Sequence, residues 1–129
     1  SAKGEDFERG NLCMKQRNQR HFIEDILEAI SKIEQYTEGM TIESFIQNML
    51  VKDAVVRNLE VIGEASHYIV QSLQEKYSDV PWKRMIGLRN IVIHEYFGID
   101  FDIIWNIITE NLPKIKPKLR RILIELNED

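Results

Sequence analysis

Apolar residues recur along the first part of the chain at intervals of three and four positions, which is the spacing of one face of an α-helix. The first apolar stripe predicts a helix over residues 17–36 that ends at Gly39, a residue typical of helix C-termini. Thr41 is a suitable N-cap for a short helix over residues 41–48. The next stripe predicts one long helix over residues 52–77.

The second half of the chain keeps the same helical period. Pro81 suits the first position of a helix over residues 81–97, and Gly98 suits its end. The β-branched residues 91–93 would also fit a strand, but the apolar residues around them keep the helical spacing, which favours the helix.

The last part of the chain predicts a further helical stretch with an interruption. Asp100 or Asp102 is its N-cap, and Pro113 removes a helical hydrogen bond, which predicts a kink or a new start. No strand pattern remains. The sequence therefore predicts an all-α fold, a single-domain antiparallel four-helix bundle with short additional helices.

The composition is that of an ordinary globular protein, with 43% hydrophobic and 29% charged residues. The apolar runs are far shorter than the roughly 18 residues of a membrane span, and no signal-peptide pattern is present, so we expect a soluble cytoplasmic protein. A net charge of −4 argues against coating nucleic acid by bulk charge but allows a local phosphate site. Residues 1–13 are small, polar and aperiodic, so we interpret them as an expression remnant and residues 14–129 as the domain.

Two neighbouring residues interrupt the apolar pattern of the predicted long helix. Gly63 costs a helix about 1 kcal/mol relative to alanine, which indicates that another backbone comes close to it. Glu64 follows in an otherwise apolar surround. We favour a structural ion pair of Glu64 with Arg57 or a neighbouring helix over the alternative that Glu64 holds Arg89 or His94 in position.

Several other residues that can bind metals or nucleic acids fit structural roles. His21 and His67 lack metal-ligand spacing, and neither a metal nor a cofactor is expected. Trp82 and Trp105 fit core or interface positions better than base stacking. The basic run over residues 114–121 fits a solvated helix face, and an arm that guides RNA is the alternative.

The segment over residues 89–96 carries the side chains best suited to chemistry, because Arg89, Asn90, His94 and Tyr96 fall within two turns of the predicted helix. Arg89 and His94 would lie about 140° apart around one helix. One helix therefore cannot easily aim both at a small target. Two copies packed across a two-fold axis would collect both residue types in one cleft.

Arginine and histidine together suit metal-free RNA cleavage, because arginine grips phosphate and histidine moves protons near neutral pH. His94 would take the proton from the attacking 2′-OH or give one to the leaving 5′-oxygen, and Arg89 would stabilise the negative charge of the phosphorane. Asn90 would orient His94 or the phosphate. From the pattern alone, the alternative is a surface arginine and a hydrogen-bonded structural histidine.

With its surroundings, this segment resembles a known family. Arg89, Asn90, three apolar residues, His94 and Tyr96 are similar to the Arg-x4-His-x-Tyr signature of HepT-type toxins in the HEPN superfamily. The resemblance covers nearly all of residues 14–129, including the segments 58–65, 81–82, 86–90 and 94–100.

The resemblance implies an all-helical homodimeric ribonuclease, the toxin of a toxin–antitoxin pair, with the Arg/His motif at the dimer cleft. It also implies an antitoxin partner of the minimal nucleotidyltransferase (MNT) type, which in related systems uses ATP to attach AMP to the motif tyrosine, here Tyr96. A bulky anion beside the cleft would repel RNA phosphates. Two alternatives stay open: a non-catalytic accessory or binding subunit of the nucleotidyltransferase, and a plain structural bundle.

Overall fold

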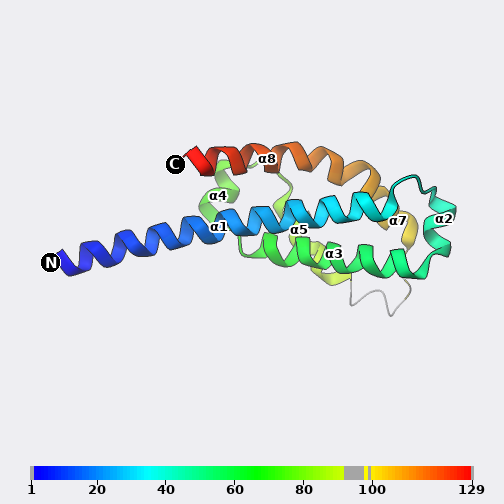
Figure 1. Cartoon of the computed structure of the whole chain (residues 1–129), viewed down its shortest axis with the longest axis horizontal. Helices are drawn as coiled ribbons and strands as arrows, with labels where there is room; N and C mark the ends of the chain where they lie inside the picture. Colours follow the sequence, from blue (N-terminus) through cyan, green and yellow to red (C-terminus); the bar gives the residue numbers. More distant parts are fainter. Residues whose placement is uncertain (1, 92–97, 99, 129) are drawn as a thin grey trace.

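The computed structural model describes residues 2–91, 98 and 100–128, with the backbone alone at residues 2–17 and 128. All regular structure within these ranges is helical, so the fold is the predicted all-α helical bundle (Figure 1). The elements are α1 (Ala2–Thr37), α2 (Ile42–Gln47), α3 (Met49–His67), α4 (Gln71–Lys76), α5 (Trp82–Gly87), the 3-10 helix η1 (Leu88–Asn90), α7 (Phe101–Asn106), the π-helix η2 (Ile107–Asn111) and α8 (Leu112–Glu128). None of the described helices combines the length and the apolar character needed to cross a membrane.

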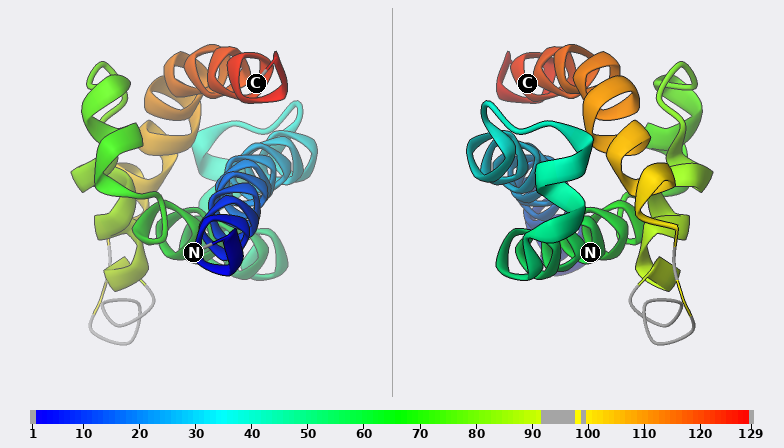
Figure 2. Two further views of the ribbon diagram at one scale, coloured as in Figure 1. Left: turned by 90° about the vertical axis from the view of Figure 1, so that its left-hand side faces the viewer. Right: turned by 90° about the vertical axis from the view of Figure 1, so that its right-hand side faces the viewer.

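The long helices lie side by side along the bundle. α1 packs against α3, which runs in the opposite direction, and also against α8 (Figures 1 and 2). α5 and η1 pack on α3, and α2 contacts α7 at one end of the bundle. The first turns of α1 extend beyond the other helices (Figure 1). This arrangement places η1, which carries Arg89, directly against α3.

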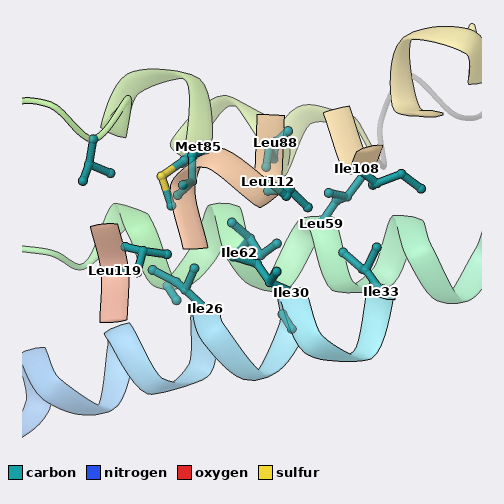
Figure 3. Close-up of a cluster of buried hydrophobic side chains, with 14 of the residues drawn as sticks. Ile26, Ile30, Ile33, Leu59, Ile62, Met85, Leu88, Ile108, Leu112 and Leu119 are labelled. Atoms are coloured by element: carbon teal, nitrogen blue, oxygen red, sulfur yellow. The ribbon is translucent and has the colours of Figure 1, made fainter. Parts of the chain in front are cut away.

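The hydrophobic core fills the space between these helices. Ile26 and Ile30 of α1 face Ile62 of α3, and Met85 and Leu119 close the core from α5 and α8 (Figure 3). Each of these side chains is at most 1% exposed, and burying one stabilises the fold by roughly 1.5–3 kcal/mol.

Both tryptophans belong to this packed interior, as predicted. Trp82 is 5% exposed, and its Nε1 donates a hydrogen bond to the Tyr77 carbonyl at 3.0 Å. Trp105 is half-buried, with its ring centroid 5.1 Å from that of Phe45. A buried indole needs a partner for its N–H, and the Tyr77 carbonyl provides one.

The helix ends follow the predicted capping residues. Gly39 adopts φ +75° after α1, a conformation that glycine reaches without the clash of a Cβ atom. Thr41 caps α2 in a reciprocal capping box with Ser44. Of the two candidate aspartates, Asp100 caps α7, and its carboxylate accepts from the backbone N–H of Asp102 at 2.9 Å.

The first helix begins earlier than predicted. The chain is helical from Ala2 rather than from about residue 17, so the aperiodic residues 2–13 form the first turns of α1. Their pattern does not show this because helix extension needs no apolar face: each added residue gains one hydrogen bond on a helix that already exists. The interpretation of residues 1–13 as an expression remnant stays a prediction.

The prediction of one long helix over residues 52–77 is wrong, because α3 ends at His67 and α4 begins at Gln71. Gln19 of α1 holds the connecting backbone: its Nε2 donates to the Tyr68 carbonyl at 3.1 Å, and its Oε1 accepts from the Val70 N–H at 2.9 Å. A buried side-chain amide thus pairs with two backbone groups that would bond within the helix if the helix continued.

The helix predicted over residues 81–97 is confirmed only at its beginning. Pro81 is the N-cap of α5, one position before the first helical position predicted for it, and the chain tightens into η1 at Leu88. The rest of the predicted span, apart from Ile91, lies outside the described residues. Gly98, predicted to end this helix, has φ +88°.

Pro113 has the predicted effect of disturbing the last helical stretch. It has no N–H for the carbonyl of Thr109 four residues earlier, and its ring crowds that carbonyl. The chain responds with the wider turn of η2, in which the Leu112 N–H donates to the Ile107 carbonyl, and α8 follows directly. The result is a π segment within a continuous helical path.

Candidate active site

The close contact between η1 and α3 depends on Gly63. A Cβ atom at this position would lie 2.6 Å from the backbone nitrogen of Arg89 and 2.7 Å from its Cγ. Any larger residue would therefore push the two helices apart. The expectation that another backbone approaches Gly63 is confirmed, and that backbone belongs to Arg89.

The Arg89 side chain is held by the next residue of α3. Its Nε lies 3.0 Å from Oε2 of Glu64, and the two side chains are 37% and 49% exposed. Arg57 pairs with Glu60 at 3.2 Å, so of the two favoured partners of Glu64, Arg57 is wrong and a neighbouring helix is confirmed. The pair is made to a neighbouring helical segment, and its partner is the candidate catalytic arginine.

This geometry leaves part of the guanidinium available. Glu64 forms its ion pair with Nε, and the two terminal nitrogens of Arg89 have no hydrogen-bond partner among the described residues. Asn90 follows and is exposed. A positioned arginine with free N–H donors can bind a phosphate through two parallel hydrogen bonds.

The structure brings together Arg89 and Glu64 and places Asn90 beside them. His94 and Tyr96, the other two residues of the motif, lie outside the described residues. Their assignment as proton-transfer residue and modification site therefore stays a prediction.

Sequence patterns did not reveal a shallow depression beside Glu64, of about 290 Å³, lined from α1 and α3. Its charged residues are Asp25, Arg57, Glu60 and Glu64. Three carboxylates against one guanidinium give this surface an excess of negative charge, which repels RNA phosphates. Helical periodicity shows which residues face outward, but it does not show that two helices form a hollow between them.

Both described histidines make contacts that fit ordinary helix-face residues. Nδ1 of His21 lies 3.4 Å from Oε2 of Glu24, and the ring of His67 meets the ring of Tyr68 edge-on. Among the described residues, no group of three or more His, Cys, Asp or Glu could hold a metal ion.

Three side chains of the basic run over residues 114–121 have separate partners. Lys116 pairs with Glu34 at 3.0 Å, and Lys118 donates to the Asp79 carbonyl at 2.9 Å. Arg121 pairs with Glu125 at 3.3 Å, while a hydrogen bond from Tyr77 is the main cause of the lowered pKa of that carboxyl. These separate partners do not favour a continuous arm for RNA.

A model of the "Ribonuclease HepT-like" family matches residues 26–122 of the chain, which is most of its length. The chain belongs to the HepT-like ribonuclease family. This HepT-like chain is 46% identical over 106 residues to "Putative RNase MJ1380" of Methanocaldococcus jannaschii, covering 82% of the chain and 97% of the relative. It is 36% identical over 106 residues to "Probable ribonuclease HepT" of Thermococcus cleftensis, covering 82% and 96%.

A third relative of this HepT-like chain is "Putative RNase MJ0125" of Methanocaldococcus jannaschii, 39% identical over 115 residues, or 89% of the chain and 99% of the relative. No solved structure matches the chain significantly. The family match supports an RNA substrate.

Proposed function

We propose that this HepT-like protein is a metal-independent endoribonuclease and the toxin of a toxin–antitoxin pair. The observation that carries the proposal is the way the Arg89 side chain is held. Its Nε lies 3.0 Å from Oε2 of Glu64, and the terminal nitrogens of Arg89 have no partner among the described residues. A guanidinium fixed in this way can stabilise the charge that develops on phosphorus during RNA cleavage.

In the proposed reaction, the 2′-oxygen of one nucleotide loses its proton and attacks the adjacent phosphorus. The bond between phosphorus and the 5′-oxygen of the next nucleotide breaks, and that oxygen gains a proton. His94 takes the first proton or gives the second, and Asn90 orients His94 or the phosphate. The products are a 2′,3′-cyclic phosphate and a 5′-hydroxyl.

The proposed site is formed by two subunits of a homodimer. One imidazole cannot act as base and acid in the same step, and one helix would direct Arg89 and His94 about 140° apart. A second copy across a two-fold axis supplies the complementary arginine and histidine to a common cleft.

Control of the proposed toxin would come from a minimal nucleotidyltransferase antitoxin. The Tyr96 hydroxyl would attack the α-phosphorus of ATP, form a phosphodiester with AMP and release pyrophosphate. Tyr96 follows His94 by two positions, so the attached anion would lie close to the cleft and repel RNA phosphates.

The test is RNA cleavage by the purified protein in EDTA. Wild type is expected to cut total RNA and leave cyclic phosphate ends, while Arg89→Ala and His94→Ala lose about 10²-fold or more. Arg57→Ala is the matched control, because Arg57 is also an arginine paired with a glutamate of α3. Circular dichroism and sedimentation establish fold and oligomeric state for each variant.

Two outcomes would contradict the proposal. Cleavage that Arg89→Ala leaves unchanged would exclude the assigned site. A folded dimer that cuts no RNA but binds a nucleotidyltransferase would instead support the non-catalytic accessory subunit. Growth arrest on expression, relieved by the co-expressed nucleotidyltransferase, tests the toxin role separately.

A further inference from the structure

A groove of about 590 Å³ lies between two parts of the bundle, with α5 and η1 on one side and α7, η2 and α8 on the other. Its lining is mainly aliphatic: Met85 and Leu88 come from the first side, and Ile103, Ile107 and Leu112 from the second. Leu88 and Leu112 lie next to each other in Figure 3. Ile103 is 59% exposed, so the groove presents apolar surface to the outside.

The π segment keeps one row of side chains directed at this groove. Ile103, Ile107, Asn111 and Ile115 follow one another at intervals of four, and all of them line the groove. In a regular α-helix, each such step would rotate the side chain by about 40° away from the groove. The wider turn of η2, which contains Ile107 and Asn111, holds more residues per turn and rotates the row back.

The charged residues on the groove are mostly basic. Arg84, Lys114 and Lys118 line it, and Asp79 is the acidic residue among the described lining. None of the three basic side chains forms an ion pair with a described residue, and Lys118 uses its Nζ on the Asp79 carbonyl. The groove therefore combines an aliphatic floor with an excess of positive charge among its described residues.

We propose that this groove is a docking site for an acidic amphipathic helix of a partner protein. Such a helix would place leucine- or methionine-type side chains on the aliphatic floor and acidic side chains beside Arg84 and Lys114. Arg89 is not part of the lining, so the proposal does not rest on RNA cleavage.

The same observations disfavour two other occupants. RNA would meet the basic side chains, but none of the described lining residues is an aromatic on which a base could stack. A second copy of the chain centred on this groove across a two-fold axis would bring the same basic side chains against each other.

The probe for this groove is a designed helical peptide of about 20 residues, long enough to form a helix in water, with leucine on one face and glutamate on its flanks. A second peptide carries lysine in place of each glutamate. Fluorescence anisotropy should show binding of the acidic peptide and at least about tenfold weaker binding of the basic one. The doubly charge-reversed protein, Arg84→Glu with Lys114→Glu, should prefer the basic peptide.

Two matched controls separate the groove from general charge and apolarity. Arg120 is an exposed residue of α8 outside the groove. The Arg120→Glu variant should therefore bind the acidic peptide like wild type. Ile103→Gln should weaken binding by about fivefold or more, while Ile124→Gln should not, although the two isoleucines are 59% and 60% exposed.

Equal affinity for both peptides, or an equal loss in Arg120→Glu, would overturn the proposal. So would groove variants that lose RNA binding but keep peptide binding, or that change the sedimenting mass, since these results would assign the groove to RNA or to a second copy. Arg89→Ala should bind the acidic peptide normally, so failure of this proposal and failure of the ribonuclease proposal are distinguishable.

Discussion

Gly63 and Glu64 are adjacent residues of α3, and they act on the same arginine in different ways. Gly63 lets the Arg89 backbone come close enough for the side chain to reach α3. Glu64 then fixes the direction of the guanidinium at 3.0 Å. Free arginine side chains carry about 2 kcal/mol of rotamer entropy, so an arginine held in advance loses less when it binds phosphate. In the proposed site, both residues would position Arg89 rather than contact the RNA themselves.

Gly63→Ala should destabilise the fold, because the added Cβ would lie 2.6 Å from the Arg89 nitrogen. Overpacking of this kind costs roughly 1–3 kcal/mol, which exceeds the helix propensity that alanine gains. Urea unfolding measures the difference. Gly87→Ala is the control, since nothing lies within 4 Å of a Cβ there, and it should be neutral or slightly stabilising. Equal stabilities of the two variants would contradict the close approach.

Glu64→Gln should fold normally and lose activity. The ion pair is half-exposed, and such pairs contribute only about 0–1 kcal/mol to stability. A misdirected Arg89 should lower kcat about tenfold or more without raising KM for RNA, because phosphate stabilisation in the transition state depends on orientation. A purely structural role would change the melting temperature instead of kcat.

The neighbouring pair of Arg57 and Glu60 offers the control for this measurement. Glu60→Gln removes an ion pair of 3.2 Å on the same helix, and kcat should stay at the wild-type value. If Glu64→Gln keeps full activity, or if both glutamine variants lose it equally, Glu64 has no specific part in positioning Arg89.

At the scale of helices, the apolar period predicts helical segments well and their interruptions poorly. The period records which side chains turn inward, and it runs on from α3 through Ile69, which is 3% exposed, to the partly buried Leu73 of α4. The interruption comes from Gln19, distant in sequence.

The same limit applies to the site. Arg89 and Asn90 stand out in a local motif, but the pairing of Glu64 depends on how η1 packs on α3.

Gln19→Ala should destabilise the connection between α3 and α4. The Tyr68 carbonyl and the Val70 N–H, both part-buried, would lose their partner, and each lost hydrogen bond costs about 1 kcal/mol. We expect the free energy of unfolding to fall by about 2 kcal/mol or more, with faster hydrogen exchange at Val70. Gln71→Ala, which removes only an exposed bond to Glu75, should stay within about 0.5 kcal/mol of wild type.

At the scale of the whole molecule, two features bear on the proposed site. The net charge favours local binding of RNA, and the single motif in each subunit favours a site shared by two subunits. The chain carries a net charge of −4, which does not attract RNA over long range, so the proposed RNA affinity would have to come from fixed groups such as Arg89. One subunit holds that guanidinium through Glu64, and it contributes one Arg89 and one His94 to the proposed cleft. A two-fold partner doubles each residue type without any new sequence.

Mixed dimers test this sharing directly. Co-expression of Arg89→Ala and His94→Ala chains with different affinity tags, followed by purification on both tags, isolates the heterodimer. Each parent homodimer lacks one residue type entirely, whereas the heterodimer retains one Arg89 and one His94, on different chains. If the cleft collects residues from both subunits, the heterodimer should cleave RNA well above either homodimer. If each subunit carried a complete site, every site in the heterodimer would lack one residue, and its activity would stay at the level of the parents.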